Sequence, residues 1–202
     1  MSRTSIWSYD KRVHTSILYG YADPLSLSDD EYGELVAFYA LRTPCEGLSL
    51  QSVPFSAYGW TGDIRNNGLG KLLDERKVTS GGAFLLPSRA PDGLPSTLNG
   101  RYLGQLFRHA SLGDGPLIDW TVERAVIAAT SGSNSWLRLF RHVRNCLVHG
   151  RFICLPVEGG LGPMLVMEDE DKYNYTARIV LRVETLLVWK RTIEAGPVQI
   201  AF

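Results

Sequence analysis

The stretch that decides the fold of this chain runs from Arg138 to Arg151 and reads RLFRHVRNCLVHGR. Its apolar residues recur at three- and four-residue steps, as they do in a helix that buries one face: Leu139, Phe140, Val143 and Leu147. Gly150 follows His149 directly and suits the left-handed turn that ends many helices. We therefore predict an amphipathic helix over 134–149.

The same stretch is basic, and nothing beside it in the sequence neutralises it. No Asp or Glu occurs from Arg124 to Val157, although the whole chain has a formal net charge of +0 and a pI of about 6.9. A local positive field of this kind attracts phosphate groups. Any affinity for nucleic acid must therefore come from this stretch and not from the chain as a whole.

Three side chains of different chemistry meet at the end of the predicted helix. Asn145 and His149 are four residues apart and lie one above the other. Arg144 is about 140° around the axis from His149 at roughly 100° per residue, a gap that its long side chain can cover. The helix end therefore offers an imidazole, a guanidinium and an amide in one place.

The run Arg144-Asn145-x-x-x-His149, followed by Gly150, resembles the signature of the HEPN superfamily, in which an Arg and usually a polar residue precede a His after a short spacer. The resemblance covers roughly the C-terminal half of the chain. It implies a small helical bundle, commonly a dimer. It also implies a metal-independent ribonuclease of the kind found in toxin, antiphage-defence and RNA-processing systems.

The predicted fold is accordingly mainly α: a HEPN-like bundle of four to five helices over 96–202. The apolar rhythm places helices near 97–111, 116–130, 134–149 and 173–194. A small β-hairpin, built from 152–157 and 164–167, should follow the motif helix. Residues 1–95 should form a separate segment packed on the bundle. In this segment a helix begins after Ser28 and ends before Pro44, and a loop-rich extension follows it.

Cleavage of RNA without a metal requires a group that moves protons and a group that stabilises charge on phosphorus. We expect His149 to act as acid and base, Arg144 to bind the phosphate, and Asn145 to hold a substrate oxygen or orient His149. One chain then supplies one reactive His, so a homodimer would complete the pair. The partners expected are RNA, a second copy of the chain, and an antitoxin or nucleotidyltransferase. The residues expected to hold RNA are Arg138, Arg141, His142 and Arg151, although His142 could equally have no role.

Other interpretations of these residues remain open. Arg144 and Asn145 could simply face solvent while His149 ends a helix. The protein could be a non-catalytic module of HEPN type that binds RNA or nucleotide, or a bundle that binds only proteins. The run Asn66–Lys71 is better explained as a turn than as a phosphate loop. The acidic residues 168–171 are better explained as a solvated turn before a helix than as Mg²⁺ ligands, and they could also neutralise the basic helix.

Composition bounds the rest. A hydrophobic content of 45% with 21% charged residues is ordinary for a globular chain able to bury a core. The N-terminal sequence lacks the apolar segment of a secretory signal, and no apolar run approaches the length of a membrane span. The three cysteines, Cys45, Cys146 and Cys154, lack metal-site spacing. We therefore expect a cytoplasmic protein with reduced cysteines and neither a metal nor another cofactor.

Overall fold

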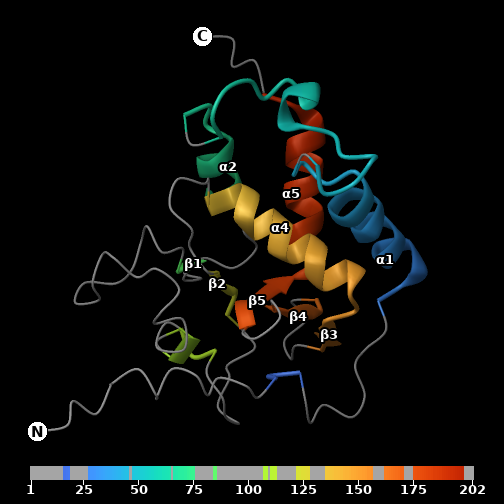
Figure 1. Ribbon diagram of the computed structural model, residues 1–202, viewed down its shortest axis with the longest axis vertical. Helices are drawn as coiled ribbons and strands as arrows, with labels where there is room; N and C mark the ends of the chain where they lie inside the picture. Colours follow the sequence, from blue (N-terminus) through green and yellow to red (C-terminus); the bar gives the residue numbers. More distant parts are fainter. Residues whose placement is uncertain are drawn as a thin grey trace, which may run out of the picture.

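The computed structural model describes residues 16–18, 27–45, 47–64, 66–75, 84–85, 107–108, 110–112, 122–127, 135–156, 162–170 and 175–197. Within them a five-stranded sheet has the order β1-β2-β5-β4-β3. Its strands are β1 (Phe84–Leu85), β2 (Arg124–Ile127), β3 (Phe152–Leu155), β4 (Met164–Glu170) and β5 (Tyr175–Arg182). The two-residue β1 pairs in parallel with β2, and the other neighbours are antiparallel. Figure 1 shows the sheet below the helices α4 and α5.

The central strands are buried on both faces, and their side chains divide between two cores by strict alternation. Side chains on one face of the sheet enter the larger core, which the helices cover: Ala125, Ile127, Leu165, Met167, Ala177, Ile179 and Leu181. Side chains on the opposite face enter a smaller core with Ile17, Phe107 and Leu112: Val126, Met164, Val166 and Val180. A strand covered on both sides needs apolar residues on both faces, as in residues 164–167 of β4 and 179–181 of β5, whereas the buried charged residues of these strands need partners of opposite charge.

Four helical segments contribute to the larger core. They are α1 (Asp29–Leu35), which continues as the π-helix η3 (Val36–Leu41), then α2 (Leu69–Glu75), α4 (Ser135–Val148) and α5 (Val183–Ala195). A short 3₁₀ turn, η4 (Phe55–Tyr58), packs against α5. α4 contacts η3 on one side and strands β2 and β4 on the other. The larger core therefore joins elements from both predicted segments, 1–95 and 96–202.

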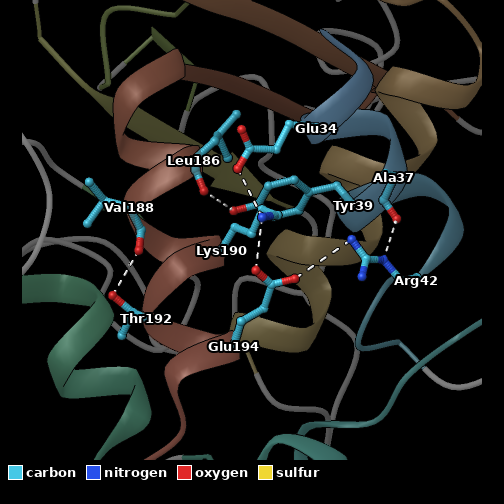
Figure 2. Close-up of polar contacts among 9 residues, drawn as sticks. All are labelled: Glu34, Ala37, Tyr39, Arg42, Leu186, Val188, Lys190, Thr192 and Glu194. Carbon is cyan, nitrogen blue, oxygen red and sulfur yellow. Dashed lines mark hydrogen bonds and ion pairs between the residues drawn. The ribbon is translucent and has the colours of Figure 1, made fainter. Parts of the chain in front are cut away.

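Polar contacts fasten α1 and η3 to α5 (Figure 2). Lys190 Nζ of α5 lies 2.9 Å from Glu34 Oε1 of α1, and Glu194, which lies 2.9 Å from Lys190 on the same helix, also pairs with Arg42 after η3 at 3.8 Å. Tyr39 is fully buried, and its hydroxyl group donates to the carbonyl oxygen of Leu186 at 2.6 Å. These contacts hold the N-terminal helices against the last helix, and so fix one wall of the core that α4 completes.

Several predicted elements are confirmed. The helix predicted over 134–149 is α4, and Gly150 ends it with a φ of 64°. The predicted start after Ser28 is a capping box, in which the Ser28 hydroxyl and the Glu31 carboxylate each bond the other residue's backbone N–H group. Residues 66–68 form a turn that leads into α2, as the interpretation of that run required. The hairpin after the motif helix is present as β3 and β4.

The prediction of a mainly α, HEPN-like helical bundle is wrong. The described residues form a mixed α/β structure with a five-stranded sheet, of which the predicted hairpin is one edge. The helix predicted over 116–130 is replaced by β2 at its described residues 124–127, and the helix predicted over 173–194 is β5 followed by α5. The helix predicted over 97–111 lies almost entirely outside the described residues.

The error over 173–194 has an identifiable cause in the spacing of its charges. Arg178 and Arg182 are four residues apart, a step that returns to the same face of a helix and also to the same face of a strand. Between them stand the β-branched residues Ile179 and Val180, which favour a strand with two buried faces. The neighbouring prediction for 168–171 is also wrong, because Glu168 and Asp169 are buried residues of β4 and not a solvated turn.

Candidate functional site

The candidate site lies on the side of α4 that does not enter the core. Its buried side is apolar: Leu139, Phe140, Val143, Cys146 and Leu147. On the opposite side Arg141, Val148 and His149 are exposed, and His142, Arg144 and Asn145 are partly buried at the border. The amphipathic pattern of the sequence thus places the predicted site residues between the core and solvent.

The centre of the site is the carboxylate of Asp169, which β4 supplies. Asp169 Oδ2 lies 2.7 Å from His142 Nδ1 and accepts a hydrogen bond from Asn145 Nδ2 at 2.9 Å. Only 6% of the Asp169 side chain and 12% of the His142 side chain are exposed. An ionised carboxylate can only accept, so Nδ1 of His142 is the donor in this pair.

Arg144 joins the same chain of hydrogen bonds through Asn145. One terminal nitrogen of its guanidinium donates to Asn145 Oδ1 at 3.2 Å, and the other donates to the carbonyl oxygen of Leu48 at 3.0 Å. The amide of Asn145 therefore bridges a cation on one side and a carboxylate on the other. The Asn145 side chain thus bonds Arg144 and Asp169, whereas the sequence analysis expected it to orient His149 or hold a substrate oxygen.

His149 lies beside this network without entering it. It follows the last residue of α4, and its backbone N–H group donates to the carbonyl oxygen of Asn145 at 3.0 Å. The residue is exposed, and its imidazole makes no hydrogen bond within the described ranges. The structure therefore joins Arg144 to Asn145, and leaves His149 open to solvent on the next turn.

The residues expected to hold RNA are in three different settings. Arg141 is exposed. Arg138 is partly buried, and burial together with the positive charge of Arg141 lowers its pKa. Arg151 forms an ion pair with Glu170 at the edge of the sheet. The positive field predicted from the sequence is thus partly neutralised by the acidic end of β4, which was one of the three roles considered for those residues.

Cys146, between the site residues in sequence, faces the core. Burial raises the pKa of its thiol well above the usual value, and the carboxylates of Asp169 and Glu168 raise it further. Since the thiolate is the reactive form of cysteine, this residue is a packing group and not a nucleophile.

The residue that the sequence analysis missed is Asp169. The acidic cluster was visible, but nothing local indicates that its second member, and not its first, turns toward α4. Successive side chains of a strand point to opposite faces, so Glu168 goes to the smaller core and Asp169 to the helix. If residues 164–170 had been predicted as a strand, its alternation of faces would have indicated that Glu168 and Asp169 point in opposite directions.

Within the described ranges no three His, Cys, Asp or Glu side chains gather as a metal site would require. None of the described helices combines the length and the apolar character needed to cross a membrane. A scan against protein-family models gives no match to the chain, and neither the curated proteins nor the solved structures that were compared match it.

Proposed function

We propose that the protein is an endoribonuclease that cleaves RNA by attack of the ribose 2′-hydroxyl group, without a metal ion, at the C-terminal end of α4. One observation carries this proposal: a guanidinium is bonded to an amide that a buried carboxylate holds, and an exposed histidine follows on the next turn of the same helix. The proposal rests on these side chains and not on the helical bundle that the signature implied.

Each group has a role that its setting supports. Arg144 uses two of its five N–H donors in the bonds to Leu48 and Asn145, which leaves donors for a phosphate oxygen. His149 is exposed, so its imidazole can reach a ribose or phosphate oxygen. Arg141, exposed on the same side of α4, provides charge that positions the RNA backbone.

The test is cleavage of a labelled single-stranded RNA in excess EDTA by the wild-type protein and by His149→Gln. His149 is exposed and makes no side-chain hydrogen bond in the described part of the chain, so the variant should fold normally. Removing one positioned acid–base group typically lowers the rate about 10²–10⁴-fold. Wild-type cleavage should leave a 2′,3′-cyclic phosphate end.

The matched control is Lys71→Ala, because the Lys71 side chain is 82% exposed on α2, outside the site. It should cleave at the wild-type rate. Loss of wild-type activity in EDTA, or equal rates for wild type and His149→Gln, would refute the proposal.

A second function, RNA binding without cleavage, is favoured by one observation. Arg144 already donates to two protein oxygens, and a guanidinium so occupied could serve only to hold the helix in place. In that case the wild-type protein should bind RNA in a salt-dependent way and leave it intact.

A further inference from the structure

His142 has a hydrogen-bond arrangement that a histidine with a purely packing role does not need. Its Nδ1 atom donates to Asp169, and the ring's other nitrogen, Nε2, has no hydrogen-bond partner among the described residues. A carboxylate on Nδ1 fixes the proton there, so Nε2 carries the lone pair and can accept a proton. This is the way a buried Asp orients the base of a Ser-His-Asp triad.

Asp169 is itself held in place by a second bond. Asn145 Nδ2 donates to the same oxygen, Oδ2, at 2.9 Å. Asn145 therefore already ties α4 to β4 through this carboxylate, and a histidine is not needed for that tie alone.

His142 and His149 lie on one side of α4 and its end. They are seven positions apart, which at roughly 100° and 1.5 Å per residue puts them about 20° apart around the axis and about 10 Å apart along it. The oxygens that enter and leave in an in-line displacement flank the phosphorus. With a hydrogen bond of about 3 Å to each oxygen, two imidazoles separated by up to about 10 Å can serve both.

We propose that His142, positioned by Asp169, is the general base of the proposed ribonuclease, and that it acts in the same chain as His149. Nε2 of His142 removes the proton of the 2′-hydroxyl group, and the 2′-oxygen forms a bond to phosphorus. The bond from phosphorus to the 5′-oxygen breaks, and protonated His149 donates a proton to that oxygen. The products are a 2′,3′-cyclic phosphate and a 5′-hydroxyl end, and one proton has passed through each histidine.

This inference rests on the proposed function and changes what the site needs. Two proton transfers no longer require two copies of His149, so a single chain contains both groups. The guanidinium of Arg144 lies between the two histidines in sequence and is linked to His142 through Asn145 and Asp169.

The experiment compares His142→Gln and His149→Gln on two substrates. One is a uridine-containing RNA, and the other is uridine 3′-(4-nitrophenyl phosphate), whose nitrophenolate leaves without needing a proton. The glutamine side chain of the His142→Gln variant retains an amide N–H group that can donate to Asp169, which favours a folded variant. The cleavage rate of His142→Gln should be lower than that of wild type by at least about 100-fold on both substrates. The rate of His149→Gln should fall as much on RNA but little on the nitrophenyl ester.

The outcomes separate this inference from the proposed function. If the wild-type protein does not cleave RNA, the proposed function and this inference both fail. If the wild type cleaves and His142→Gln cleaves equally fast, or recovers on the nitrophenyl ester, His142 is not the base and only the inference fails. Mixing the two variants should restore no activity, and restored activity would show that the histidines act from different chains.

A measurement on the wild-type protein does not depend on how the variants fold. Titration with uridine 3′-monophosphate should shift the Cε1–H resonances of both His142 and His149 in the NMR spectrum. A shift confined to His149 would overturn the proposal, because a general base must lie beside the bound nucleotide.

Discussion

Replacing Asp169 by Asn should destabilise the protein more than neutralising its neighbour Glu170, which lies at the exposed end of β4. Asp169 accepts hydrogen bonds from His142 and Asn145 with 6% of its side chain exposed. Both donors bond the same oxygen, Oδ2, so an Asn side chain of nearly the same shape can place its single accepting oxygen there and keep both bonds. Both bonds then lose their charge assistance, at about 1 kcal/mol each, so we expect a loss of about 2 kcal/mol.

The measurement is urea unfolding followed by tryptophan fluorescence, with the slope m checked for constancy between variants. Glu170→Gln is the matched control, since it neutralises the next residue of the same strand. Glu170 pairs with Arg151, and both side chains are 36% exposed, so this change should cost at most about 1 kcal/mol. Equal losses for the two variants would refute the claim that Asp169 is the buried centre of the site.

Two further results are expected. Lys190→Met should remove part of the loss of stability that occurs at alkaline pH. Burial lowers the pKa of Lys190, but the hydrogen bonds and charges of Glu194 and Glu34 outweigh burial and raise this pKa above 10.5, so the stabilisation is complete below pH 10.5 and is lost as the pH rises through the raised pKa. In urea unfolding, the pH dependence of the free energy of unfolding should therefore differ between wild type and Lys190→Met above pH 10.5 and not at neutral pH. Arg141→Ala should weaken RNA binding and reduce the slope of log K against log salt by about one, whereas Arg151→Ala should change it less, because Arg151 is already paired with Glu170. Equal salt slopes for the two variants would contradict the placement of Arg141 on the RNA surface.

The part of the site that could be predicted from the sequence is the part that a single helix contains. The period of Leu139, Val143 and Leu147 indicates the buried side of α4, and therefore also the border that carries Arg144 and Asn145. Gly150 indicates where the helix ends. These relations depend only on local geometry, so one chain segment suffices to derive them.

The remainder depends on contacts between distant segments. Asp169 meets His142 across 27 residues, and no local pattern shows that pairing. The sheet was missed for a related reason. In β5, the spacing of Arg178 and Arg182 is that of the solvent-exposed side of a helix, and only their partners show that both residues are buried. Arg178 is buried because Glu168 binds it at 2.9 Å and the carbonyl oxygen of Leu112 accepts a second bond at 2.7 Å.

The consecutive carboxylates of β4 bear on how the strand is aligned. Glu168 accepts a hydrogen bond from Arg178 in the smaller core, and Asp169 is hydrogen-bonded to His142 beneath α4. A shift of the strand by one residue would turn each acid to the wrong side and leave a buried Arg without its anion, at a cost of several kcal/mol. The pair thus selects one alignment out of those that the apolar residues of β4 alone would tolerate, so deletion of one residue between Met164 and Met167 should damage the fold more than any single apolar substitution there.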